Sequence, residues 1–211
     1  MYLPAHFAET RRDVLHPLMQ ARPLATLISQ IDGRIEANHL PLHLSPDEGP
    51  LGVLRGHAAR ANPFWQGGAG EVLAIFHGPE TYITPSWYPS KREHGRVVPT
   101  WNYVVVHARC TLRVHDDPDW LRVHLAALTA GQEARFDQPW ALADAPADYL
   151  ARMLQAVVGI ELEIGELTGK WKTSQNQGAE NRRGVVAGLE AQGDADALAM
   201  AALVAAYGQE A

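Results

Sequence analysis

The chain has 211 residues, which suits one large domain or a domain with a small appendage. Hydrophobic residues make up 46% of it and charged residues 20%, so it can bury a core, and wholesale disorder is excluded. The formal net charge of −6 argues mildly against nucleic acid as the main partner, because tight binding to phosphates usually requires a basic face.

The sequence carries no sign of a membrane or secretory destination. No apolar run approaches the roughly 20 residues that span a bilayer, and the first residues lack the basic region and apolar stretch of a secretory signal. The single cysteine, Cys110, cannot form an internal disulfide, which suits a reducing compartment. We therefore expect a cytoplasmic protein that does not bind membranes.

Apolar spacing and turn residues predict the secondary structure. Short apolar or alternating runs between glycine and proline pairs indicate strands, and apolar residues three or four positions apart indicate helices. The expected strands span residues 24–30, 34–40, 51–56, 72–77, 81–87, 101–115 and 159–167. The expected helices begin near residues 10–13, 58, 116, 147 and 194.

These elements favour one architecture. The strands come in two groups, with helices before, between and after them, and no repeat period is visible. Because strands and helices do not alternate regularly, a doubly wound parallel sheet is disfavoured. We expect an α+β fold that is mainly β, an antiparallel barrel or sheet with peripheral helices.

The segment from Arg55 to Pro63 is the first candidate binding element. It passes from a strand through Gly56 and His57 toward a predicted helix start, with Arg60 close by. Backbone N–H groups at such a junction, assisted by an arginine, can hold a phosphate. An ordinary strand-to-helix turn with surface arginines explains the same pattern, and the spacing alone favours that simpler interpretation.

Two further segments are rich in hydrogen-bonding groups. Thr84 and Ser86 lie two positions apart on a predicted strand, so both hydroxyls would face one side and could bind a phosphate or a ring carbonyl. Trp101-Asn102 follows a proline, and a late segment combines one cation with hydroxyls and amides. Strand-edge residues and a helix cap are the plain alternatives. The late segment comprises Lys172, Thr173, Ser174, Gln175 and Asn176.

Other familiar sites are not supported by spacing. His39 and His43 would lie about 13 Å apart in an extended segment, too far for one zinc ion, so no metal site is expected. Cys110, within a strand, is expected to be buried and inert. Residues 121–136 offer a weak helix-turn-helix with its turn at Gly131, but the second half is short and not strongly basic.

Taken together, these segments resemble the PaiB-like family, described as FMN-binding negative transcriptional regulators. They occur in the family's order and cover nearly the whole chain to about Gly188. The family usually continues the last motif with arginine, where Gln177 stands here. The matching segments are residues 1–4 with His6-Phe7, 38–41, 56–58 with Asn62-Pro63, 82–88, 98–103 and 172–176.

The resemblance implies an FMN-binding split barrel related to the pyridoxamine phosphate oxidases, normally a homodimer with the flavin at the subunit interface. It further implies a flavin-binding domain over residues 1–170, with inserted helices at 117–157. Residues 171–211 would then form a ligand-contacting segment with helices packed on the same domain. The expected FMN contacts are Arg55, Gly56, His57, Arg60, Thr84, Ser86, Trp101, Asn102, Lys172, Ser174, Gln175 and Asn176.

Several functions stay open beside an FMN-binding regulator. A bound flavin could support an FMN-dependent reductase or oxidase acting on a small molecule, although the sequence shows no dedicated acid–base dyad. The family description also suggests a DNA-binding repressor, which the acidic balance disfavours. Haem in the same cleft is a further alternative, since related split barrels accommodate it.

Overall fold

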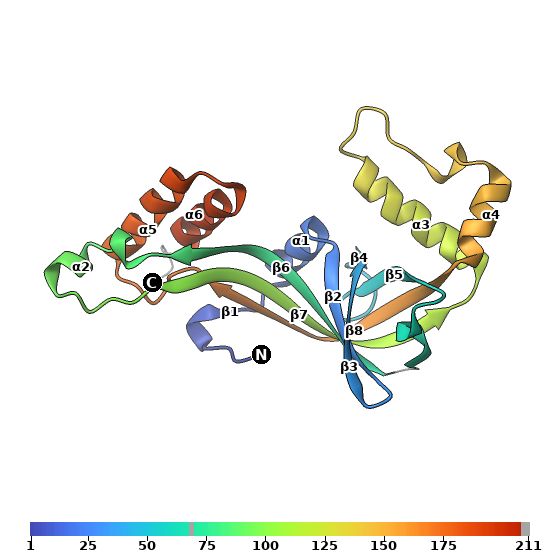
Figure 1. The fold of residues 1–211 in the computed structure, drawn as a ribbon, viewed down its shortest axis with the longest axis horizontal. Helices are drawn as coiled ribbons and strands as arrows, with labels where there is room; N and C mark the ends of the chain where they lie inside the picture. Colours follow the sequence, from blue (N-terminus) through green and yellow to red (C-terminus); the bar gives the residue numbers. More distant parts are fainter. Residues whose placement is uncertain (68–69, 208–211) are drawn as a thin grey trace. The chain divides into compact units, whose positions relative to one another are not determined.

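A mainly antiparallel sheet of eight strands organises residues 1–67 and 70–207, which the computed structural model describes (Figure 1). Buried and exposed side chains alternate along the 13-residue strand β6, because successive residues of a strand face opposite sides. The strand order is β3-β2-β6-β7-β8-β5-β4, and β1 pairs with β8 outside this path. The strands are β1 (Ala8–Glu9), β2 (Leu24–Ile31), β3 (Arg34–Pro41), β4 (His43–Ser45), β5 (Val53–Ala59), β6 (Glu71–Ile83), β7 (Thr100–His115) and β8 (Val157–Lys172).

Helices lie before, between and after the strands. The structure therefore confirms the expected α+β, mainly antiparallel split barrel with peripheral helices. None of the helices in the described residues is both long and apolar enough to cross a bilayer. The α-helices are α1 (Arg12–Ala21), α2 (Ser90–Glu93), α3 (Pro118–Glu133), α4 (Ala147–Gln155), α5 (Ala179–Gln192) and α6 (Ala195–Tyr207), and the 3₁₀ helices are η1 (Ala5–Phe7), η2 (Pro63–Gly67), η3 (Pro85–Trp87) and η4 (Leu142–Asp144).

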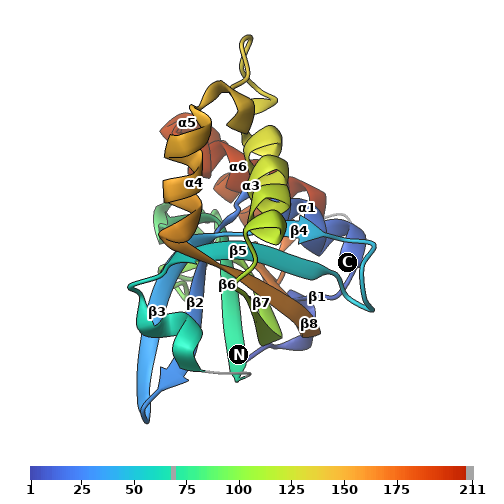
Figure 2. The ribbon, with the colours of Figure 1, turned by 90° about the vertical axis from the view of Figure 1, so that its right-hand side faces the viewer.

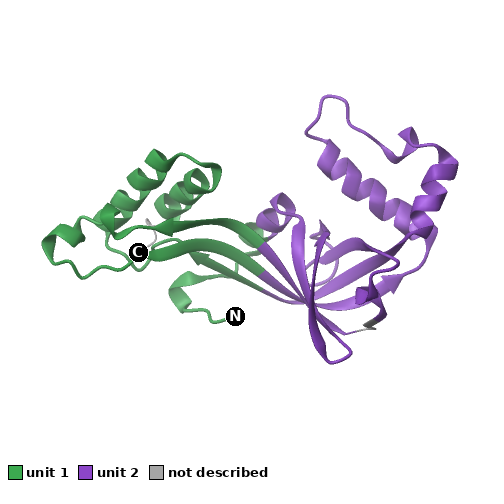
Figure 3. Ribbon diagram, in the orientation of Figure 1, with its two compact units in different colours: residues 1–15, 77–106, 168–211 green, residues 16–76, 107–167 purple. Residues whose placement is uncertain are grey.

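The chain packs into two compact units (Figure 3). Strands β6, β7 and β8 contribute residues to both of them. The division at residue 170 expected from the sequence remains a prediction, because compactness does not show which segments fold together. Unit 1 comprises Met1–Leu15, His77–Val106 and Thr168–Ala211, and unit 2 comprises His16–Phe76 and His107–Leu167.

A two-residue turn in unit 2 joins β2 to β3. The two strands pair in register from Leu24 opposite Pro41 to Ile31 opposite Arg34. Asp32 and Gly33 have φ angles of 49° and 78°, the left-handed conformations that a two-residue hairpin turn requires. The hairpin predicted from Asp32-Gly33 is confirmed.

Unit 2 also contains a helical hairpin, α3 and α4, which lie side by side (Figure 2). The Asp117 side chain caps α3 by accepting a 2.9 Å hydrogen bond from the Asp119 N–H, as the acidic residues and proline at this helix start predict. The two helices share a small apolar core of their own, built from Leu121, Leu150 and Leu154. The helical hairpin is therefore stabilised by its own apolar packing.

In unit 1, helices α5 and α6 pack against each other (Figure 1). Trp87 of η3 contacts α5. Gly184 and Gly188 lie one turn apart on α5, and a Cβ at either would overlap Trp87. Asn181, on the same face, accepts hydrogen bonds from the Ser90 N–H and hydroxyl at 3.4 and 3.0 Å. The glycines thus form a notch that only a bare backbone allows.

The structure corrects two predicted boundaries around β6. The strands expected at 72–77 and 81–87 are one continuous strand, because Gly78-Pro79 does not interrupt it; proline is tolerated in a strand where its missing N–H is not needed. The strand ends at Ile83, so Thr84 and Ser86 do not share a strand face. Thr84 instead caps η3, its hydroxyl accepting a 3.2 Å hydrogen bond from the Ser86 N–H.

Two helix predictions also change, and one helix was not predicted. The helix expected from residue 58 is absent, because Ala58 and Ala59 pair with Val158 and Val157 of β8 and only η2 follows. Gly131 makes no turn, since α3 continues to Glu133, so the weak helix-turn-helix of residues 121–136 is not present. Helix α5 was not predicted, because its apolar spacing is poor.

The glycine notch gives a stability prediction. Gly188→Ala places a methyl group into the Trp87 ring and should destabilise the protein by about 1–3 kcal/mol, the usual range for overpacking. Gly131→Ala is the matched control: it lies in α3 with nothing near the new Cβ, and should stabilise by about 0.5–1 kcal/mol. Urea unfolding of both variants measures the change in the free energy of unfolding. Equal changes in the two variants would contradict the close packing of Trp87 against Gly188.

Candidate functional site

The residues predicted to contact a ligand fall in both units. Arg55, Gly56, His57 and Arg60 belong to unit 2. The other eight belong to unit 1, where most of them come from the ends of β7 and β8 and the loop that follows β8. These eight are Thr84, Ser86, Trp101, Asn102, Lys172, Ser174, Gln175 and Asn176.

Two lysines at the end of β8 form the strongest cationic feature of unit 1, here called the lysine pair. Lys170 and Lys172 are two positions apart on the strand and therefore share a face. Their ammonium groups lie 5.3 and 6.0 Å from the centre of the Tyr103 ring. The Lys170 ammonium, on a side chain only 8% exposed, donates a 3.1 Å hydrogen bond to the Tyr2 carbonyl.

The lysine pair lacks a carboxylate partner within residues 1–67 and 70–207. The Lys172 ammonium donates to the Thr100 hydroxyl and, at 2.6 Å, to the Trp101 carbonyl, both neutral groups. Partial burial, with repulsion from Lys170, lowers the pKa of Lys172. Two neighbouring cations compensated only by neutral oxygens and a ring are a favourable place for an anion.

A buried polar cluster joins Asn102 of β7 to the residues that follow Lys172. Asn102, 1% exposed, donates a 2.9 Å hydrogen bond from its amide to the Ser174 hydroxyl. The Asn102 side-chain oxygen and the Thr173 hydroxyl are buried with no protein partner in the described parts of the chain. An unsatisfied buried polar atom costs about 1–3 kcal/mol, so both atoms suit a ligand or water that supplies the missing bonds.

Gln175 holds the loop after β8 in shape. Its side-chain oxygen accepts from the Thr173 N–H at 2.7 Å, and its amide donates to the Trp171 carbonyl at 2.5 Å. Between these anchors Ser174 adopts a φ of 64°, the left-handed region that non-glycine residues rarely occupy. Gln175 therefore acts on the loop conformation, whereas the neighbouring Asn176 is exposed.

An exposed aromatic edge adjoins the lysine pair. Trp101 is 53% exposed and packs edge-to-face against Tyr82, with ring centres 6.0 Å apart. An exposed indole can cover a planar ring. Ser86 makes no recorded contact with these two rings in the described residues. Its hydroxyl accepts a 3.1 Å hydrogen bond from Lys91.

The two arginines predicted as phosphate contacts are already paired in unit 2. Arg55 bonds to both oxygens of Glu48, at 2.7 and 2.6 Å, and to Glu161 at 2.9 Å. Hydrogen bonds from Arg55 lower the pKa of Glu48 to about 2, so this pair stays charged. Arg60 makes a bidentate bond to Asp116, at 3.0 and 2.5 Å. Both guanidinium groups are thus largely committed to the protein.

Gly56 serves packing within the sheet. It lies inside β5, opposite Ile160 of β8, and a Cβ there would come within 2.7 Å of Leu42. The strand-to-helix junction that suggested an anion site is therefore absent at this glycine. His57, next to it, is bonded to His124. Contact of Arg55, Gly56, His57 and Arg60 with a cofactor remains a prediction.

Sequence reasoning missed several residues of the unit 1 site. The alternation along β8 could have identified Lys170 as the partner of Lys172, because the two positions share a face. The Tyr103 ring beneath them had no such signal, since it comes from another strand about 70 residues earlier.

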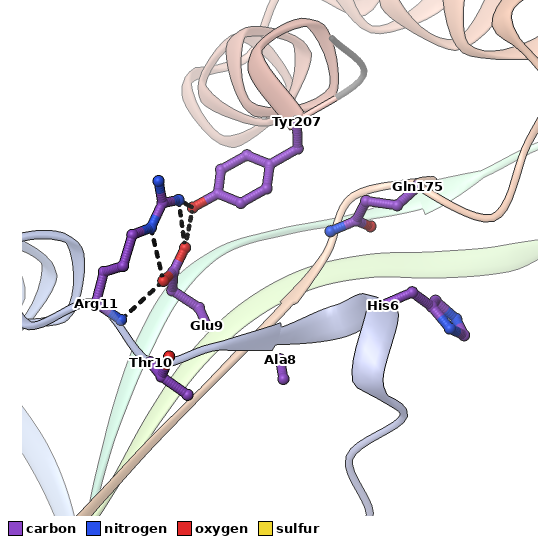
Figure 4. A pocket seen from close by; sticks show the side chains of 7 residues that line it. All are labelled: His6, Ala8, Glu9, Thr10, Arg11, Gln175 and Tyr207. Carbon is purple, nitrogen blue, oxygen red and sulfur yellow. Dashed lines mark hydrogen bonds and ion pairs between the residues drawn. The ribbon is translucent and has the colours of Figure 1, made fainter. Parts of the chain in front are cut away.

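A pocket of about 520 Å³ adjoins the Gln175 loop within unit 1 (Figure 4). In it the buried Glu9 carboxylate accepts from the Arg11 guanidinium at 2.7 and 3.0 Å and from the Tyr207 hydroxyl at 2.6 Å. Burial alone would raise the pKa of Glu9, but these hydrogen bonds outweigh it and hold the pKa at about 2. The carboxylate ties the N-terminal segment to α6.

This network predicts an acid-sensitive stability. The pKa of Glu9 in the folded protein lies below its ordinary value of 4.5, so its contribution is present above pH 4.5 and is lost as the pH falls toward 2. Glu9→Gln should lower the free energy of unfolding at pH 7 and flatten its decline between pH 4.5 and 3. Glu180→Gln is the control, because Glu180 belongs to an exposed ion pair on α5. It should change neither the free energy of unfolding at pH 7 nor its decline in acid. Identical pH profiles for wild type and Glu9→Gln would contradict the assignment.

Comparison with known proteins places the chain in a family. Residues 1–166 match the model of the family described as "Putative FMN-binding domain". An uncharacterized protein of Emericella nidulans is 34% identical over 90% of each chain. The protease synthase and sporulation protein PAI 2 of Bacillus subtilis is 28% identical over 97% of this chain and 96% of that protein.

Solved structures agree on the fold. The FAD and haem binding protein of Mycobacterium smegmatis superposes with a TM-score of 0.56 at 21% identity, over 78% of this chain and 73% of that one. The flavocytochrome Anf3 of Azotobacter vinelandii gives a TM-score of 0.54 at 14% identity, over 78% and 69%. Because the family model matches most of its length, the chain belongs to the family described as "Putative FMN-binding domain", and FMN is its cofactor.

Proposed function

We propose that this protein is a homodimeric flavoprotein that binds FMN at its subunit interface, with the lysine pair contacting the FMN phosphate. The observation that carries the proposal is the pair itself: two adjacent ammonium groups without a carboxylate partner within the described chain. A phosphate monoester bears between one and two negative charges near pH 7, which matches two lysines. The arginines of unit 2 fit less well, because carboxylates already neutralise them.

The polar cluster beside Lys172 supports a ligand with several hydrogen-bonding groups. FMN offers hydroxyls on its ribityl chain and a ring edge of alternating carbonyl and N–H groups. The unpartnered Asn102 oxygen can accept a hydrogen bond, and the Thr173 hydroxyl can donate or accept one. Gln175 keeps the loop between them in one conformation, so little ordering would be needed on binding.

The exposed apolar side chains of unit 1 support the dimer. Two of them, Tyr82 and Trp101, are in contact with each other, and adjoining exposed apolar side chains often mark an interaction site. A stable interface would need to bury roughly 1,200–2,000 Å² in total. A homodimer supplies the same residues twice and would cover them on both copies. They include Tyr2 (84% exposed), Val98 (75%), Trp101 (53%) and Tyr82 (46%).

FMN supplies hydride and electron transfer when bound, so a reductase or oxidase activity is compatible with the site. The chain's own contribution would be to bind the phosphate, orient the ring and keep the loop after β8 fixed. The B. subtilis relative is named a protease synthase and sporulation protein, and the resemblance to FMN-binding regulators is the ground for proposing a regulatory role for this chain. We place the regulator proposal above direct DNA binding, because residues 121–136 form no helix-turn-helix.

The lysine pair predicts how FMN binding responds to substitution. Lys170→Met and Lys172→Met each remove one charged hydrogen-bonding group and should raise the Kd for FMN about 10–100-fold, as charge-assisted bonds are worth about 1.5–3 kcal/mol. Quenching of flavin fluorescence on titration with protein measures the affinity. Arg183→Met removes an exposed cation of the same unit and is the matched control. Unchanged affinity in both lysine variants would reject the phosphate placement, and a wild-type protein that takes up no FMN would reject the function.

The dimer has its own test. Light scattering after gel filtration should give about twice the 23.1 kDa chain mass for the wild type. Trp101→Glu puts a charge into the exposed aromatic edge and should shift the protein toward monomer. Tyr149→Glu alters a similarly exposed aromatic of α4, outside unit 1, and should leave the mass unchanged. A wild-type monomer at micromolar concentration would contradict the homodimer.

A further inference from the structure

Four aromatic rings are arranged in a series where α3 meets β5 in unit 2. His115 stacks on Trp120, with ring centres 4.2 Å apart and planes 5° from parallel. Trp120 lies 5.5 Å from His124, and His124 lies 5.5 Å from His57. A Cβ at Gly159 would overlap the Trp120 ring, so β8 leaves room for it only because this position is glycine.

The contact between the two inner histidines depends on their protonation. His57 Nδ1 and His124 Nε2 are 3.3 Å apart, so one ring must donate its N–H to a bare nitrogen of the other. His124 is 3% exposed, and its Nδ1 has no protein partner among the residues described. Burial and the nearby positive groups lower its pKa to about 4, and burial lowers the pKa of His57. Both rings are therefore neutral at pH 7.

The groups that surround the pair do not favour added positive charge. His43 of β4 lines the same small pocket as His124, together with Arg55 of β5. The carboxylates nearby are already engaged: Glu48 and Glu161 hold Arg55, and Glu161 also lies 3.7 Å from His115. The Asp116 carboxylate is held by Arg60. Protonation of His57 and His124 would thus place two positive charges next to each other and near Arg55, which is unfavourable.

The helical hairpin of α3 and α4 does not depend on β5 for its own packing. The buried residues of its core, Leu121, Leu150 and Leu154, come from its own two helices, and Val157 at the start of β8 packs against them. Two pockets of about 220 Å³ each lie beside α3, one lined by His124 and Val123 and the other by Leu128 and Gly131. Apart from the ring series and the Arg60 hydrogen bonds to Asp116 and the Gln155 carbonyl, α3 is therefore incompletely packed against the strands. Loss of the ring contacts would leave the α3 helix poorly supported, and a short helix without packing is marginal in water.

We propose that the His57–His124 contact is a proton-sensitive latch: the neutral pair holds the α3–α4 hairpin on β5, and protonation of both rings releases it. A released imidazole would return toward the ordinary histidine pKa of about 6.5. Below that pH, a histidine that stays neutral while docked multiplies the released-to-docked ratio by up to about ten per pH unit, so two such histidines give up to about 100-fold. The latch stands independently of FMN binding.

Hydrogen exchange of backbone amides tests the latch on the full chain. Exchange is followed at pH 7.5, 6.5, 5.5 and 5.0 and corrected for the intrinsic rate at each pH. Protection of α3 amides should fall by up to 100-fold per pH unit below 6.5, while amides of β2 and β3 keep theirs. Equal pH dependence in α3 and in β2–β3 would overturn the proposal.

Two variants identify the histidines responsible. His124→Leu keeps the site apolar and should reduce the pH dependence in α3 to that of one histidine, at most tenfold per unit. His57→Phe should do the same and covers the case in which His124→Leu leaves α3 unprotected at pH 7.5. His39→Leu, an exposed histidine of β3, is the matched control and should retain the full dependence. A full dependence in both latch variants would also overturn the proposal.

Discussion

Strand β8 carries residues of both units, and the two-residue period of its side chains decides what each unit holds. In unit 2 its Gly159 leaves space for Trp120, and its Glu161 holds Arg55. In unit 1 the same alternation brings the lysine pair to one face, over Tyr103. A shift of register by one residue would move all of these groups to the opposite face and remove both sites.

The distribution of paired and unpaired cations follows from this arrangement. In unit 2, Arg55 and Arg60 each bond to a carboxylate, so their positive charge is largely neutralised by the protein itself. The lysine pair meets only hydroxyl, carbonyl and ring partners. Since an anion gains most from cations that lack a competing carboxylate, the chemistry of unit 1 suits FMN phosphate better than that of unit 2.

The segment around β5 that was predicted to bind phosphate is bonded to residues at the two ends of the helical hairpin. His57 contacts His124 of α3, and Arg60 bonds to Asp116 and to the Gln155 carbonyl at the end of α4. These contacts fix the two ends of the helical hairpin to one strand. A change in the docking of the hairpin would therefore alter the contacts of His57 and Arg60.

Local chemistry visible in the sequence determined the Asp32-Gly33 turn, the Asp117 cap and the order of the family segments. Buried Cys110, whose pKa burial raises to about 12, was likewise predictable from its strand position. The tertiary structure alone decided which charges are neutralised and which rings meet. Arg55 bonds to Glu161, 106 positions away in the sequence, and Lys172 bonds to the Trp101 carbonyl, 71 positions away. Turns and caps depend on neighbouring residues, whereas these pairings depend on strand register, which a single sequence does not display.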